Sequence, residues 1–559
     1  MSVGAMSSRP PCTTRWPIPA ISVSYQALFN DIEGRRDNFA YRYNPDGLAK
    51  QRTRAITHGL DVSHALGPSA FYNLSLRQNY FDYEDKLYDD VWDPRYDAAG
   101  PPITDPNYEL GAVIQGADFT RFSQRTTTYL AKGSFVDQVN EFHLVKIGGE
   151  YQLPRIRFGT PGHLVASIED GIPTLVRHVD EPPDYPGVVE YRPVIASAFA
   201  QDQIEWNEIT LRAGARFDYF DARSTVPSNL ANPANSIAGA PPSVPKPTSR
   251  KTSVSPRLGV AYPITDRAAI HFAYGHFYQY PPIGEIFKNS DYSILTDLQA
   301  GGADYEALGN PDIKPEQTIQ YEFGYKHALT DRLGLDLTLF YKDIRDLLGV
   351  EFVSTYNVAE YSRLTNVDYG SVVGFTVSLD QRRIGILSST LDYTWQLAQG
   401  NSSDPRETAT RAEAGLDDRP RQVPFNWDQR HTLNMSIALD RPNDFAVSTI
   451  VRMASGQPYT PVLESGFGYG LESNSGRKPA SLLIDMRAEK LLRRSGDFRV
   501  GLFGRAFNVL DTRYSNGFVF ADTGSPYYTR FPEQTSLYDP TRFYAARRVE
   551  IGLRIGMDG

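Results

Sequence analysis

The sequence lacks the features that mark most other classes of protein. Its 559 residues include a single cysteine, Cys12, so it has no disulfide framework and no thiolate metal cluster. No run of about 18 apolar residues occurs, which excludes a helical membrane span. The net charge of -9 is mild, and lysine and arginine do not gather into the basic clusters that bind nucleic acid. We therefore expect no nucleic-acid partner.

Alternation of apolar and polar residues dominates what is present. Residues 317–345 contain two segments in which every second side chain is apolar, and successive strand residues point to opposite faces of a sheet. Such a face is either the core of a soluble sandwich or the lipid-facing side of a membrane barrel. For a barrel, we predict that the lipid-facing side chains include Tyr321, Phe323, Leu335, Leu337, Leu339, Leu391 and Trp395.

The connections between strands alternate between short and long. Short turns such as 64–70, 262–269 and 327–334 carry the glycine, proline and aspartate residues of tight reversals. Loops longer than about 12 to 15 residues are uncommon in compact soluble domains, yet eight are expected here. They cover 83–120, 169–187, 222–252, 281–315, 346–370, 399–429, 457–480 and 511–545.

This rhythm predicts an all-β, transmembrane antiparallel β-barrel with short periplasmic turns and long extracellular loops. Eighteen strands can be counted, including one at 140–152 and one at 154–168, and one or two more are expected between 19 and 43. About 18–20 strands would then be present. The aromatic content of 12% suits aromatic girdles at the two membrane surfaces.

Five segments of the chain carry a recognisable pattern. They are PRLGVAYPITDRAAIHFAYGHFYQ (256–279), NPDIKPEQTIQYEFGYKHAL (310–329), NWDQRHTLN (426–434), SGQPYTP (455–461) and FNVLDTRY (507–514). In this order they resemble the C-terminal barrel of TonB-dependent outer-membrane receptors, most closely the Oar-like ones. The resemblance implies a barrel of 22 strands around an N-terminal plug, with TonB using the proton-motive force to admit a bound ligand.

The N-terminal region departs from the family pattern. Residues 1–24 do not have the apolar core of a secretory signal, no TonB box or plug-like segment follows, and AISVSYQALFN (20–30) already resembles a barrel strand. We expect residues 1–18 to be an unstructured or truncated N-terminus and 19–559 to be the barrel. The chain would then be an N-terminally truncated copy that engages TonB only if the missing plug and box are restored.

The segment FDYEDKLYDDVWDPRYD (81–97) is the candidate binding loop. Its aromatic side chains suit stacking on a ligand, and loops held by a rigid scaffold often carry binding residues. We assign ligand binding to Tyr88, Asp89, Asp90 and Trp92. The competing interpretation is an ordinary solvated acidic loop.

No catalytic or metal site is predicted. Asp428 and His431 in DQRHT have no nucleophile motif near them, so the three-part geometry of catalysis is not visible. The resemblance implies an outer-membrane receptor or transporter for ligand uptake coupled to TonB. We expect a monomer in the outer membrane, in contact with its lipid, that is not an enzyme, needs no cofactor and binds a small-molecule, glycan or peptide ligand. A passive porin-like channel is the alternative.

Overall fold

A single antiparallel sheet dominates the computed structural model of this protein. The structure describes residues 6–8, 12–18, 20–105, 107–169, 172–182, 184–290, 292–296, 307–401, 422–462, 473–495, 498–533, 536–537 and 539–557. Parts of the predicted loops 169–187, 281–315, 399–429, 457–480 and 511–545 lie outside these residues. No helix within the described ranges is both long and apolar enough to cross a bilayer.

Long strands form the wall of this sheet, and each pairs with its neighbours in sequence order. They are β3 (Ile21–Arg35), β4 (Lys50–Ala65), β5 (Ala70–Lys86), β8 (Arg121–Gln138), β9 (His143–Gly159), β13 (Val194–Trp206), β14 (Ile209–Asp221), β17 (Lys251–Thr265), β18 (Ala268–Gln279), β19 (Glu316–Thr330), β20 (Leu333–Ser354), β21 (Glu360–Ile384), β22 (Leu387–Gly400), β24 (His431–Arg441), β25 (Phe445–Ala454), β28 (Ser481–Ser495), β29 (Phe498–Phe507) and β30 (Arg548–Met557).

Four shorter strands bring the sheet to 22 strands: β1 (Met6–Ser8), β2 (Cys12–Ile18), β12 (Val188–Tyr191) and β23 (Val423–Pro424). Strands β1 and β2 both pair with β3, so backbone strands occur within the N-terminal segment that we expected to be unstructured or truncated. The domain division at residue 19 stays a prediction. Within the described residues, β30 pairs with β29 alone and the sheet is not closed.

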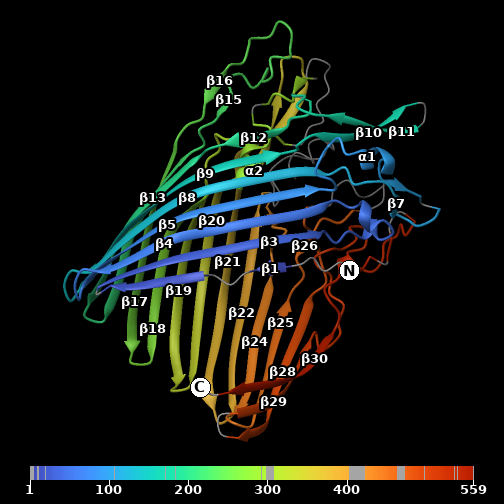
Figure 1. Cartoon of the computed structure of the whole chain (residues 1–559). Coiled ribbons are helices and arrows are strands. Elements are labelled where there is room, and N and C mark those ends of the chain that lie inside the picture. Colours follow the sequence, from blue (N-terminus) through green and yellow to red (C-terminus); the bar gives the residue numbers. More distant parts are fainter. Residues whose placement is uncertain are drawn as a thin grey trace.

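The remaining elements belong to the loops. Figure 1 shows the sheet curling so that the blue strands near the N-terminus cross in front of the yellow and orange strands. We call the end with the long connections the long-loop rim and the other end the short-turn rim. The loops contain α1 (Pro94–Ala99), α2 (Ile283–Phe287), β6 (Ile103–Thr104), β7 (Val113–Gln115), β10 (His163–Glu169), β11 (Ile172–His178), β15 (Thr225–Pro227), β16 (Pro245–Pro247), β26 (Pro458–Tyr459) and β27 (Gly476–Arg477), with 3-10 turns at Phe39–Tyr41, Pro45–Gly47 and Pro540–Arg542.

The strand faces agree with the predicted alternation. Tyr321 lies opposite Tyr341 and Phe323 opposite Leu339 in the β19–β20 ladder, and Leu339 continues to Phe375 of β21. The exposed fractions of Tyr321, Phe323 and Leu339 are 42%, 48% and 49%. The four other predicted lipid-facing residues, Leu335, Leu337, Leu391 and Trp395, are half-buried, and none of the seven belongs to a buried cluster.

The buried apolar side chains gather instead under the long loops. One cluster joins Phe220 at the end of β14 to Ile286 and Phe287 of α2 and to Leu364 of β21. A second lies under the loop around Tyr292. Among the described residues, the wall therefore has no closed apolar core of its own. Its apolar face is available to contact an apolar environment outside the protein.

Two strand predictions are wrong. The predicted strands 140–152 and 154–168 are one wall strand, β9, followed by β10, which pairs with β11 outside the wall. Pro154 sits inside β9 because the neighbouring strand is interrupted there. Pairing with β13 stops at Gln152 and pairing with β12 starts at Ile156, so the N–H that proline lacks costs no ladder bond on that side.

Candidate functional site

Residues 81–86 of the predicted binding loop belong to β5, and the remainder, 87–97, begins the connection from β5 to β8 at the long-loop rim, where Figure 1 shows α1 and β7. Local sequence gives it a defined shape. The Asp93 carboxylate accepts a hydrogen bond from the Arg95 backbone N–H at 2.9 Å, and Pro94 occupies the first helical turn, so α1 begins there. Gly100 ends the helix with a φ of 69°, a conformation that glycine adopts without strain.

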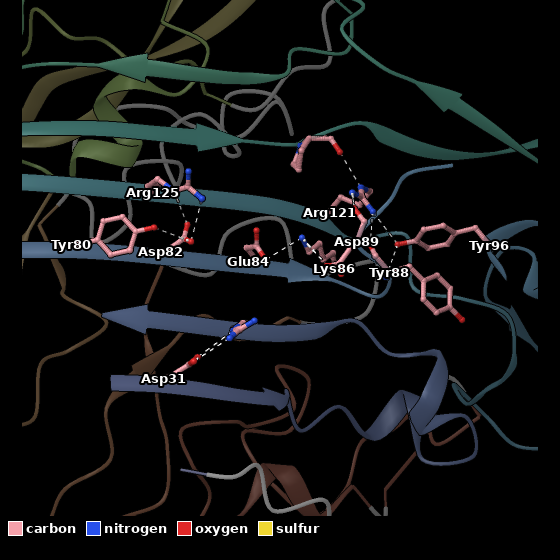
Figure 2. A network of polar contacts seen from close by, with 12 residues as sticks. Asp31, Tyr80, Asp82, Glu84, Lys86, Tyr88, Asp89, Tyr96, Arg121 and Arg125 are labelled. Atoms are coloured by element: carbon pink, nitrogen blue, oxygen red, sulfur yellow. Dashed lines mark hydrogen bonds and ion pairs between the residues drawn. The ribbon is translucent and has the colours of Figure 1, made fainter. Parts of the chain in front are cut away.

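Arg121 at the start of β8 anchors this loop. Its side chain is buried, and its guanidinium donates to the carbonyl oxygens of Tyr88 at 2.8 Å, Asp89 at 2.9 Å and Pro161 at 2.9 Å. Figure 2 shows Arg121 beside Tyr88, Asp89 and Tyr96. Because one planar guanidinium carries five N–H donors, it can hold several backbone turns at once. Arg121 thus fixes the first turn of the loop to the wall.

Two of the four predicted binding residues help to form the loop itself. The Tyr88 ring packs edge-on against buried Tyr96 with centroids 4.8 Å apart, and the Arg95 guanidinium lies 3.9 Å from the centroid of the Tyr88 ring. The Asp90 carboxylate accepts a hydrogen bond from the Trp92 backbone N–H at 3.0 Å, which closes a local turn. These contacts stabilise the loop. They occupy the half-buried Tyr88 ring, whereas the Asp90 side chain is exposed and most of its carboxylate stays accessible.

Asp89 and Trp92 are exposed as well. The Asp89 side chain is 98% exposed and forms an ion pair with Lys86 at 3.1 Å. Trp92 is 62% exposed, and the Arg177 guanidinium of β11 lies 5.5 Å from its ring centroid. The loop therefore presents the Asp89 and Asp90 carboxylates and the Trp92 indole to the outside.

Basic partners compensate most of the loop's negative charge. Hydrogen bonds from the Arg95 side chain and backbone lower the pKa of Asp93 to about 2. A hydrogen bond from Arg177 lowers the pKa of Asp97. No group of three histidine, cysteine, aspartate or glutamate side chains within the described ranges is placed to hold a metal ion.

A pocket of about 880 Å³ at another sector of the same rim was not predicted. It lies between the rim ends of β24, β25, β28, β29 and β30 and the loop that follows β29. Aromatic and amide side chains form much of its wall, together with four basic residues and one acid. These are Phe507, Tyr514, Tyr527, Tyr544, Gln429, Asn434, Asn508, Asn516, Arg452, Lys478, Arg513, Arg548 and Asp485.

The charge of this pocket is predominantly positive. Asp485 accepts from the Arg452 guanidinium at 3.4 Å and from the Asn508 backbone N–H at 2.9 Å. No carboxylate within the described parts of the chain pairs with the Lys478 ammonium group, and burial lowers the pKa of that group. Its basic residues come from separate strands and loops, so no local motif in the sequence could reveal the pocket.

Asp428, considered above for acid/base chemistry, anchors the start of β24. It is fully buried, accepts a hydrogen bond from the Ala398 backbone N–H at 2.9 Å, and pairs with Arg477 at 2.6 Å and Arg430 at 3.1 Å. The His431 ring contacts the Tyr393 hydroxyl at 2.8 Å. Both residues therefore have structural partners.

Comparisons with known proteins agree with this architecture. The model of a family described as "TonB dependent receptor-like, beta-barrel" matches residues 13–509. Among curated proteins, none matches the chain in sequence.

Several solved structures share the fold. The outer membrane transporter YddB from Escherichia coli is 12% identical with a TM-score of 0.64, and the match covers 97% of this chain and 67% of that one. The FrpB iron transporter from Neisseria meningitidis is 13% identical with a TM-score of 0.59, and the match covers 97% of this chain and 69% of that one. P. aeruginosa FpvA bound to heterologous pyoverdines is 10% identical with a TM-score of 0.61, and the match covers 96% of this chain and 63% of that one.

The Oar-like subtype stays a prediction, because neither the family model nor these structures separate subtypes. The family model, however, covers most of the chain, and the solved relatives carry the same antiparallel wall. Proteins of this family reside in the outer membrane. The chain thus belongs to the TonB-dependent receptor β-barrels and is an outer-membrane protein.

Proposed function

We propose that this protein is an outer-membrane receptor that binds its ligand at the long-loop rim and takes it up in a step energised by TonB. The observation that carries the proposal is the gathering of long, structured loops at one rim of a barrel wall. One loop there exposes Asp89 and Trp92, and a cationic, aromatic pocket lies at the same rim. Rigidly held loops of this kind suit recognition.

The ligand class follows from the family and from the chemistry of this rim. FrpB is an iron transporter, and FpvA is bound to a ferripyoverdine, an iron-loaded small molecule. We propose a small-molecule, glycan or peptide ligand for this chain, a monomeric receptor in contact with outer-membrane lipid, and no enzymatic activity. Engagement of TonB would need a plug and a TonB box, and the N-terminally truncated copy stays a prediction. The passive porin-like channel is not favoured, since the matching family is one of receptors.

Uptake measurements test the energised step. Cells expressing this barrel together with a plug and TonB box should accumulate the ligand above its external concentration, and an uncoupler of the proton-motive force should abolish the accumulation. A porin-like channel gives a different result, because diffusion only equalises concentrations. Uptake that never exceeds the external concentration and resists the uncoupler would contradict the proposal.

Substitutions in the candidate loop test where the ligand binds. Replacing Asp89 and Trp92 together with alanine should weaken ligand binding roughly tenfold, because a stacked aromatic contributes on the order of 1 kcal/mol and the ionic contact adds to it. Barrel folding should be unchanged, since both side chains are exposed. The matched control is Glu205→Ala with Trp206→Ala at the short-turn rim, where Trp206 is 65% exposed.

Calorimetric titration with the identified ligand compares the affinities of the unmodified chain, the loop variant and the control variant. An unchanged affinity in the loop variant would remove this loop from the binding site and leave the pocket beside β30 as the remaining candidate. An equal loss in the control would show that the effect is not local.

A further inference from the structure

The outward face of the first wall strands changes abruptly from apolar to charged. Two residues beyond Phe29, Ile56 and Tyr80, each strand places a charged residue on the same face. The cross-strand row that results alternates in sign from Asp31 to Arg125 and then places two arginines, Arg125 and Arg157, side by side. Figure 2 shows part of it on neighbouring strands. It consists of Asp31, Arg54, Asp82, Arg125, Arg157 and Glu190.

This row lies next to the lipid-facing band. On the same face of β4 and β5, Leu60, Leu74 and Leu76 are all exposed. They are separated from Ile56 and Tyr80 by the pair His58 and Gln78, whose side chains hydrogen-bond to each other at 3.0 Å. Two residues along a strand span roughly 7 Å, and a bilayer adds about 5 to 8 Å of polar headgroup region on each side of its hydrocarbon. Because the long loops define the outer side, the charged row stands at the headgroups of the outer leaflet.

Positive charge prevails where β9 meets β12. The Glu190 carboxylate alone faces three guanidinium groups, those of Arg192 at 2.6 Å, Arg155 at 2.9 Å and Arg157 at 4.0 Å. Arg125 of β8 completes what we call the arginine cluster (Arg125, Arg155, Arg157 and Arg192), and it pairs with Asp82 at 3.1 Å. Four cations thus share two carboxylates.

The arginine side chains and the carboxylates also differ in how much of each is exposed. The arginine side chains of the cluster are 49% to 64% exposed, whereas Glu190 is 25% and Asp82 15% exposed. The carboxylates therefore lie beneath and between the guanidinium groups. Since each guanidinium has five donors in a planar fork, N–H groups remain directed outward after the ion pairs are made.

We propose that the arginine cluster binds the phosphate groups of a phosphorylated glycolipid of the outer leaflet. Arginine forks match phosphate oxygens in pairs, and the apolar face of β8 and β9 directly below offers a surface for the acyl chains of the same molecule. An ordinary solvated row of ion pairs would not need three arginines on one carboxylate. The proposal concerns the outside of the wall and does not depend on the uptake ligand or on TonB.

Binding of phosphorylated lipid A to the purified full chain in detergent micelles tests this. The variant Arg155→Gln, Arg157→Gln and Arg192→Gln should bind this lipid at least tenfold more weakly than the unmodified chain. The matched control is Arg267→Gln, Arg383→Gln and Arg441→Gln, three similarly exposed, ion-paired arginines at the short-turn rim. It should lose less than threefold.

Three results would overturn the proposal. In the first, lipid A without its phosphates binds as tightly as phosphorylated lipid A. In the second, the two triple variants lose the same amount of lipid binding. In the third, inorganic phosphate binds the cluster as tightly as the lipid does. The variant Glu190→Gln keeps the test decisive if the triple variant fails to fold. Removing the shared carboxylate frees all three arginines, so it should tighten lipid binding severalfold, and unchanged or weaker binding would contradict the proposal.

Discussion

Single arginines determine which carboxylates of the candidate loop are available to a partner. Arg95 engages Asp93, and Arg177 engages Asp97, while Arg121 holds the backbone of the first turn. Asp89 is left with the flexible Lys86 ammonium as its partner. At this scale the loop combines paired charges with two exposed acids, Asp89 and Asp90, rather than forming a uniformly acidic surface.

Asp93 gives the loop a predictable response to pH. Its pKa in the folded chain is about 2, below the ordinary value of 3.8, so its ionised form is stabilised by folding. That contribution is complete above the unfolded pKa and is lost as the pH falls through about 2. We expect the fluorescence of Trp92, in a variant whose other tryptophans are phenylalanine, to report loosening of the loop between pH 4 and about 2.

The variant Asp93→Asn tests this assignment. The asparagine oxygen still caps α1, but it cannot be protonated in this range, so the transition should disappear. A transition of the same size and midpoint in Asp93→Asn would assign it to another carboxylate.

The sequence predicted the loop but not the roles of its residues. Aromatic and acidic residues between two strands are a local signal. The contacts of Tyr88 with Tyr96 and of Asp90 with Trp92 are also local, whereas the anchoring of the loop depends on distant partners. Arg121 and Arg177 lie on β8 and β11, and nothing in the local sequence links them to residues 88–92.

Strand faces are the feature that the sequence predicts best, because alternation with a period of two is local. The faces of β19, β20 and β22 were predicted for this reason. Residues 163–169 have the same alternation as the wall strands, and only their pairing with β11 separates them from the wall. The continuity of β9 through Pro154 could not be predicted, because the gap between β12 and β13 is a property of the folded sheet.

A charged substitution tests the face assignment of one strand. Leu337→Arg should lower the free energy of unfolding in bilayers by about 2 to 4 kcal/mol, because it places a guanidinium in the hydrocarbon region. The control Thr338→Arg, on the opposite face of β20 beside Asp336, should change it far less. Urea titration of both variants gives the measurement, and equal costs would contradict the assignment.

The whole molecule is organised by two asymmetries. Across the sheet, one face is an apolar band and the other is mainly polar. Along the strands, the buried apolar clusters and the structured loops lie at one rim, and short turns lie at the other. Together they orient the barrel, and under the proposed function recognition takes place at the outer side. Neither asymmetry identifies the ligand, which depends on loop side chains brought together from the whole chain.

Spin labels placed one at a time at residues 335–340, in a Cys12→Ser background and in lipid bilayers, test the central claim most directly. The transmembrane account predicts that labels at 335, 337 and 339 collide with oxygen dissolved in the lipid, while those at 336, 338 and 340 collide with a water-soluble nickel chelate. Labels at 335, 337 and 339 that are shielded from both reagents would place these residues in a closed protein core and contradict the account.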